Sequence, residues 1–102
     1  MAKLIVLYKK PTDPKAFDDY YFSKHVPIAQ KIAGLKRYEV NQGPVVSPAG
    51  ASPYHLVATL EFASMADLQK AMGSAEGQAA ATDLPNFATG GVEMLIFDTR
   101  EV

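Results

Sequence analysis

Residues 3–9 constrain the fold most, because this short segment is apolar on both of its alternating faces. It reads Lys-Leu-Ile-Val-Leu-Tyr-Lys, too short for a membrane span or for the apolar core of a signal peptide. Such a run is typical of a β-strand that is covered on both sides. A chain of 102 residues has room for one domain. We therefore expect one of the two faces of this strand to be covered by something other than its own helices.

An amphipathic helix is predicted to follow this strand. Asp13 and Pro14 suit the N-cap and the first helical position. At 100° per residue, one stripe should face the sheet, formed by Phe17, Tyr21, His25, Ile28 and Ile32. Pro27 cannot donate a backbone hydrogen bond, so a kink or pause is expected immediately after His25, and Gly34 should close the segment.

A second strand is predicted over residues 35–42, where the alternation places Lys36 and Tyr38 on one face. The connection 43–53 contains three prolines and two glycines. It has no usable periodicity, so we expect a long loop of the kind that often acts as a lid.

Two more strands are predicted, over residues 54–62 and 92–99. In the first of them, His55 and Glu61 belong to the face opposite Leu56. This second face is mixed in polarity, whereas the face that carries Leu56 is apolar.

Two helices are expected between these strands. Ser64 should cap the first, because Asp67 follows it in a short variant of the capping box. Its inward residues should be Met65, Leu68 and Met72. Ser74 is a candidate cap for the second, which should stop before Pro85 and lead into an irregular connection.

The element order is therefore β-α-β-β-α-β in one soluble domain over residues 1–102. This order predicts an α+β, ferredoxin-like fold with a four-stranded antiparallel sheet and helices on one face. The other face would be apolar in either strand register, so we expect a homodimer in which two sheets pack face to face as a dimeric α+β barrel. The alternative is a monomer whose loop folds over the sheet.

Four segments resemble the ethyl tert-butyl ether degradation (EthD) family. Segment 20–29 reads Tyr-Tyr-Phe-Ser-Lys-His-Val-Pro-Ile-Ala, and 34–38 reads Gly-Leu-Lys-Arg-Tyr. Segment 74–91 resembles the second signature of that family, and the first strand with Lys9-Lys10-Pro11 resembles its start. The resemblance covers nearly the whole chain and implies a dimeric α+β barrel. It also points towards oxidative degradation of small organic compounds, with a partner oxygenase as one option.

Related barrels include muconolactone isomerases, polyketide cyclases, cofactor-free monooxygenases and haem-degrading proteins, so the shared fold leaves the reaction open. His25 is the main candidate for a catalytic residue, because imidazole exchanges protons near neutral pH and the residue lies in the family motif. The alternative is a structural histidine that binds a backbone carbonyl freed by Pro27. Asp18 lies seven residues earlier, about 10 Å along a helix axis, too far to orient the ring. This spacing disfavours a hydrolase-type triad.

Five further residues are candidates for ligand binding. Tyr21 and Tyr38 are predicted to line a pocket between sheet and helices, and His55, Glu61 and Asn86 could point polar groups into it. Four of them have a structural alternative. Tyr38 and His55 could be packed strand residues with a solvated polar tip, Glu61 could be a surface charge, and Asn86 could be a turn residue that binds its own backbone.

Charge and composition argue against several classes of binding and cofactor-dependent function. The net charge is −1, with 10 basic and 11 acidic residues, so no footprint for nucleic acid or an anionic membrane is visible. Strand 54–62 also lacks the basic residues of an RNA-recognition domain. No cysteine is present, which fits a reducing cytoplasm. The two histidines lack the spacing of a zinc site, and no phosphate loop follows the first strand, so no metal or cofactor is predicted; haem at His25 rests on analogy alone.

The first hypothesis is a small enzyme or enzyme accessory that encloses an apolar organic molecule and uses His25 to move a proton. Isomerisation, cyclisation and cofactor-free oxidation would each suit such a site. The second hypothesis is a non-catalytic metabolite-binding module for an oxygenase. A third is a structural dimer with a filled core.

Overall fold

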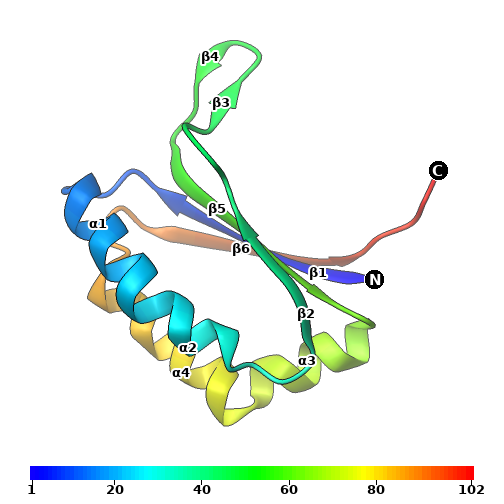
Figure 1. Cartoon of the computed structure of the whole chain (residues 1–102). Helices are drawn as coiled ribbons and strands as arrows, with labels where there is room; N and C mark the ends of the chain where they lie inside the picture. Colours follow the sequence, from blue (N-terminus) through cyan, green and yellow to red (C-terminus); the bar gives the residue numbers. More distant parts are fainter.

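The computed structural model describes all 102 residues as one sheet with a layer of helices on one face (Figure 1). The sheet is antiparallel, in the order β2-β5-β1-β6. Its strands are β1 (Ala2–Lys9), β2 (Leu35–Val40), β5 (Tyr54–Phe62) and β6 (Val92–Asp98). The helices are α1 (Pro14–Tyr20), η1 (Tyr21–His25), α2 (Val26–Gln30), α3 (Met65–Gly73), α4 (Ala75–Asp83) and η2 (Leu84–Asn86). The predicted ferredoxin-like fold is confirmed.

The predicted helix caps are present. The side chain of Asp13 accepts a hydrogen bond from the N–H of Ala16 at 3.1 Å. Ser64 caps α3 and Ser74 caps α4, and each accepts from the N–H three residues later at 3.1 Å. Each side chain satisfies one of the N–H groups that the first helical turn leaves unpaired.

A π-helical turn, η1, joins α1 to α2. The N–H of Val26 donates to the carbonyl of Tyr21, five residues back. The wider turn precedes Pro27 directly, so the chain continues as α2 where a pause was expected. The extra residue also changes the buried stripe: after His25 it continues through Ala29, whereas the expected Ile28 is only half-buried.

Two β-bulges change which side chains share a face. In β2, Leu35 pairs with Phe62 and Arg37 with Glu61, so Lys36 is the extra residue and does not share the helix-side face of Tyr38 as expected. In β5, the register skips His55. Its side chain turns towards α1 instead of keeping the alternation predicted for a regular strand.

Residues 43–53 contain a short hairpin, β3 (Val46–Ser47) and β4 (Gly50–Ala51), where an irregular loop was expected. The hairpin extends away from the helices and beyond the end of the sheet (Figure 1). In this chain it therefore does not cover the helix-side face as a lid would.

Helices α3 and α4 meet at a close contact through Gly77. A Cβ atom at this position would overlap the carbonyl oxygen of Ala71. Glycine therefore lets α4 cross the end of α3. In α3, Leu68 and Ala71 are buried, whereas Met72, also predicted to point inward, lines the cavity between sheet and helices but is 38% exposed.

The hydrophobic core lies between the sheet and the helices. Its buried residues are Ala2, Val6, Tyr8, Phe17, Tyr21, Leu56, Ala58, Leu60, Phe62, Leu68, Ala71 and Phe87. The opposite face of the sheet carries no helix, and Leu95 and Phe97 of β6 are 53% and 42% exposed. None of the helices has the length and apolar character needed to cross a membrane.

Candidate active site

A buried histidine–aspartate pair lies between the helices. His25 Nδ1 is 2.9 Å from Asp83 Oδ2, and the two residues are 5% and 7% exposed. His25 ends the π-helical turn and Asp83 ends α4. The structure thus gives His25 a carboxylate partner from another helix, whereas the structural alternative from the sequence was a backbone carbonyl.

Asp83 is held by two more side chains. Its Oδ1 atom accepts from the hydroxyl of Tyr20 at 2.5 Å and from Nδ2 of Asn86 at 3.0 Å. Burial alone would raise the pKa of Asp83, but hydrogen bonds from Tyr20, Asn86 and His25 outweigh it and lower that pKa. The side chain is therefore a carboxylate at neutral pH.

Burial lowers the pKa of His25, and the hydrogen bond to Asp83 offsets only part of this effect. The imidazole is therefore neutral at pH 7. Because the Asp83 carboxylate can only accept, Nδ1 carries the proton and donates it, which leaves a lone pair on Nε2. This is the protonation state of a general base.

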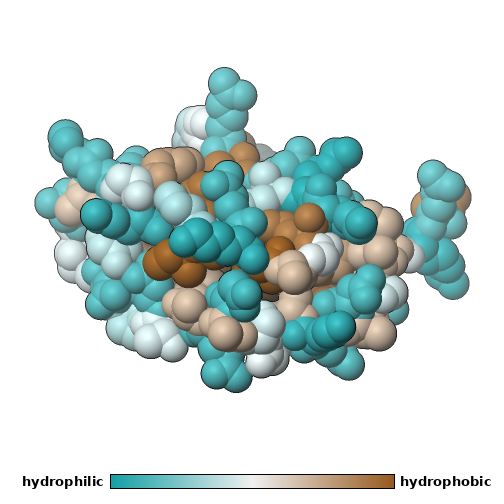
Figure 2. Space-filling view, turned by 60° about the horizontal axis from the view of Figure 1, so that its bottom comes forward, coloured by the Kyte–Doolittle hydropathy of each residue, from teal (hydrophilic) through white to brown (hydrophobic).

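His25 lines an apolar cavity, and no hydrogen bond within the protein involves its Nε2 atom. Every fully buried side-chain nitrogen or oxygen has a hydrogen bond, so the unpaired Nε2 keeps some access from outside. The cavity has a volume of about 100 Å³, and 16 of its 18 lining residues are hydrophobic. Strands β1 and β5 form its floor and the helices its roof, and apolar surface shows between the polar side chains of this face in Figure 2.

Three tyrosines supply the other polar groups of the cavity. The hydroxyls of Tyr21 and Tyr38 are 2.5 Å apart, so one donates to the other. No side-chain hydrogen bond contributes to the raised pKa of the Tyr8 hydroxyl, which is free of protein partners, and the Tyr8 residue is buried. Burial raises the pKa of all three phenols, which therefore stay protonated at neutral pH.

The residues predicted from the sequence fall into three groups. His25, Tyr21 and Tyr38 line the cavity together. Asn86 lies behind them and bonds Asp83 instead of its own backbone. His55 and Glu61 do not line the cavity.

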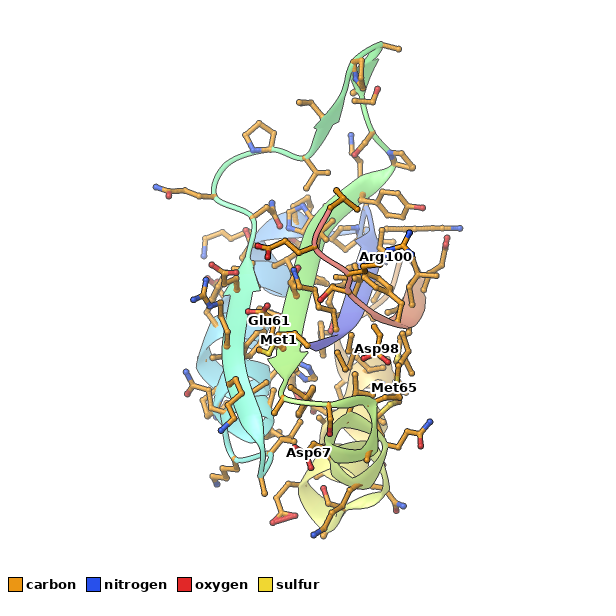
Figure 3. All side chains as sticks on the ribbon, turned by 90° about the vertical axis from the view of Figure 1, so that its right-hand side faces the viewer. Met1, Glu61, Met65, Asp67, Asp98 and Arg100 are labelled. Atoms are coloured by element: carbon orange, nitrogen blue, oxygen red, sulfur yellow. The ribbon has the colours of Figure 1, made fainter.

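His55 is bound to Asp18, with Nε2 2.7 Å from Oδ1, and its ring packs edge-on against Phe17. Glu61 belongs to the face without helices, where it pairs with Arg37 at 3.3 Å and Lys3 at 3.7 Å. Figure 3 shows Glu61 at the end of the sheet near Met1.

Sequence reasoning missed Asp83 and Tyr8. Asp83 is 58 residues from His25, and helical periodicity cannot relate positions on different helices. One signal was available, since Asp83 is the only charged residue between Gly77 and Gly91. Tyr8 was assigned only to a strand. Nowhere do three histidine, cysteine, aspartate or glutamate side chains gather as a metal site would require.

The comparison with known families is decisive, because the EthD domain model matches residues 9–91. The chain belongs to the EthD family. An uncharacterized 11.0 kDa protein from the thcB–thcC intergenic region of Rhodococcus erythropolis is 43% identical, over 100% of this chain and 98% of that protein. An EthD family protein of Bacillus halodurans is 37% identical, with a TM-score of 0.88 over 98% of this chain and 99% of that one.

A more distant structure shares the EthD fold. SnoaB of Streptomyces nogalater, a cofactor-independent oxygenase, is 15% identical, with a TM-score of 0.70 over 99% of this chain and 94% of that one. At this identity the likeness shows the fold alone. Membership of the EthD family, and not this fold likeness, supports a small-molecule-binding or enzyme-like role.

Proposed function

We propose that this EthD protein is an enzyme that binds a compact organic molecule between its sheet and helices and moves a proton with Nε2 of His25. The observation that carries the proposal is the buried His25–Asp83 pair, whose free nitrogen faces an apolar cavity. A histidine with only a packing role would need neither a fixed tautomer nor a nitrogen left free of protein partners.

Asp83 has two roles in this proposal. It fixes the tautomer in which Nε2 accepts a proton, and its negative charge stabilises the imidazolium that then forms. A positioned base of this kind contributes about 10²–10⁴-fold to a rate. Tyr20 and Asn86 keep the carboxylate in place.

Isomerisation, cyclisation and cofactor-free oxidation can each begin with removal of a proton from an organic substrate. The cofactor-independent oxygenase with the same fold supports the last of these. The EthD family supports a role in the oxidative degradation of small organics, alone or beside a partner oxygenase.

The test compares His25→Gln with the matched control His55→Gln, which alters the other histidine outside the cavity. The proteins are incubated with a mixture of small neutral organic compounds, and mass spectrometry follows binding and depletion. We expect the native protein and His55→Gln to deplete a compound that His25→Gln binds without converting. Equal depletion by all three proteins would contradict the role of His25. Binding without depletion by the native protein would favour the non-catalytic module.

We also propose that the protein is a homodimer formed through the face of the sheet without helices. This face carries Ile5 and Leu7 of β1 beside the exposed Leu95 and Phe97 of β6. Contiguous apolar surface of this kind usually marks an association site, and a two-fold axis would let each copy cover the other.

Native mass spectrometry tests the dimer. We expect the mass of two chains for the native protein and of one chain for Leu95→Lys, which places a charge in the apolar face. Gln78→Lys, on the exposed side of α4, should remain dimeric. A native protein that is monomeric at micromolar concentration would overturn this proposal.

A further inference from the structure

The polar groups in the cavity are few, and each has a defined role. Nε2 of His25 can only accept a hydrogen bond, because its lone pair is free and Nδ1 holds the proton. The Tyr21–Tyr38 pair uses one of its two protons internally, so the second remains available to a ligand. The Tyr8 hydroxyl has no protein partner and offers another proton. The cavity thus presents one acceptor and two donors.

Tyr8 lines the same cavity as His25 and the Tyr21–Tyr38 pair. Burial is the main reason that its pKa is raised, and the charges of Tyr38 and Asp83 add to the effect. The ring also packs against Tyr21, with centroids 5.6 Å apart.

The cavity does not suit an anion. Its lining includes no lysine or arginine, and the Asp83 carboxylate lies behind His25. A carboxylate or phosphate group would lose its water here without gaining a cation. A neutral ligand is favoured, with an oxygen that accepts from two hydroxyls and a nearby hydrogen that the imidazole can remove.

We propose that the substrate is a compact neutral ketone whose oxygen is held by the Tyr8 and Tyr38 or Tyr21 hydroxyls while His25 removes an α-proton. This inference rests on the proposed function and adds the substrate class. The C–H electron pair forms a carbon–carbon double bond, the carbonyl electrons move to oxygen, and Nε2 receives the proton. Protonation at the same or another carbon returns the base, so the step needs no oxidant.

Neutral hydroxyl donors in an apolar site suit this chemistry. They stabilise the negative charge that develops on oxygen, and in a site without water this interaction is stronger than in solution. Because their pKa values are raised, the phenols keep their protons instead of giving them up. The enolate is held by hydrogen bonds while the imidazolium carries the proton.

The cavity volume sets the size of the probe. An engineered cavity of about 150 Å³ holds benzene, so about 100 Å³ suits a five-membered ring with one substituent. Cyclopentanone fits this description, and methylenecyclopentane has the same shape without the oxygen. The pair isolates the contribution of the hydroxyl donors.

The first experiment measures the binding of both probes by ligand-detected NMR. We expect cyclopentanone to bind about 5–10-fold more tightly than methylenecyclopentane to the native protein, and equally tightly to Tyr8→Phe. Tyr54→Phe, a tyrosine outside the cavity, is the matched control and should keep the preference. Equal binding of the two probes to the native protein would overturn this inference and leave the proposed apolar site intact. Binding of neither probe would overturn both.

The second experiment follows exchange of the α-protons of cyclopentanone in D2O by NMR. The native protein should accelerate exchange over buffer, and Tyr8→Phe should reduce the acceleration about 100-fold, the effect of losing one donor to an oxyanion. His25→Gln should abolish it. Exchange that is unchanged in Tyr8→Phe, or absent although cyclopentanone binds, would overturn the inference.

Discussion

The chain has two histidines, and each is paired with an aspartate in a different setting. His55 Nε2 is 2.7 Å from Asp18, closer than the 2.9 Å between His25 and Asp83. Yet the side chain of Asp18 is 47% exposed, whereas both partners of the other pair are buried. Distance alone therefore does not distinguish a surface pair from a buried candidate site. The two pairs differ in burial and in the number of side chains that support the carboxylate.

The two pairs also differ in how the backbone holds them. A π-helical turn positions His25, and three side chains converge on its aspartate. A β-bulge positions His55, and Asp18 is the one hydrogen-bond partner of its side chain. Water competes for an exposed pair, so we expect it to contribute little to stability.

The sharpest test of this contrast is removal of each aspartate. Asp83→Ala leaves the buried His25, the half-buried Tyr20 and the exposed Asn86 without their shared acceptor. It should lower the free energy of unfolding by about 1–3 kcal/mol, the cost of a buried donor left unpaired. Asp18→Ala is the matched control and should cost less than about 1 kcal/mol. Urea unfolding followed by circular dichroism measures both. Similar losses would show that burial does not separate the two pairs.

The second test uses pH. The folded-state pKa of His25 lies below its ordinary value of 6.5, so acid protonates the unfolded chain first. The stability from neutral His25 is therefore fully present above pH 6.5 and is lost as the pH falls towards the lowered pKa. For this single group the slope cannot exceed about 1.4 kcal/mol per pH unit. Unfolding midpoints in urea between pH 7.5 and 5 should show this loss.

Two variants assign that loss to one histidine. His25→Gln should remove it, because no imidazole remains to titrate in the site. His55→Gln should retain it. The same slope in His25→Gln would mean that another group is responsible.

The smallest expected effect concerns Asn86, which supports Asp83 without touching His25. Asn86→Ala removes one hydrogen bond to the carboxylate and should cost about 1 kcal/mol, measured by thermal unfolding. Because one of the groups that lower the pKa of Asp83 is lost, that pKa should rise towards its ordinary value, as carboxyl NMR shifts would show. Gln42→Ala, in the loop after β2, serves as the control. No change in either measurement would remove Asn86 from the site.

Much of the fold could be predicted because its signals are local. The caps at Asp13, Ser64 and Ser74 act within three residues, and the alternation of strand β5 repeats from Leu56 to Phe62. His25, Tyr21 and Tyr38 could be chosen as candidates because a motif and a helical stripe include them, and all three line the cavity.

The remaining features depend on contacts that the local sequence does not encode. A π-turn or a bulge adds one residue and shifts every later side chain, which explains the errors at Ile28 and Lys36. Asp83 joins the site only because α4 packs beside α2, and Gly77 permits the crossing of α3 that brings it there.

The exposed edge of strand β6 affects the newly synthesised chain before its fold and assembly are complete. It is an edge strand in which Met94, Leu95, Ile96 and Phe97 are exposed in succession, with neither a charge nor a proline among them. Such a segment pairs readily with any other strand that it meets, so newly made chains are prone to aggregation until this edge is covered. The refolding yield should therefore fall as the protein concentration rises, because unfolded chains then meet more often and can pair through β6. Chaperones that shield apolar strands should matter most before this edge is covered.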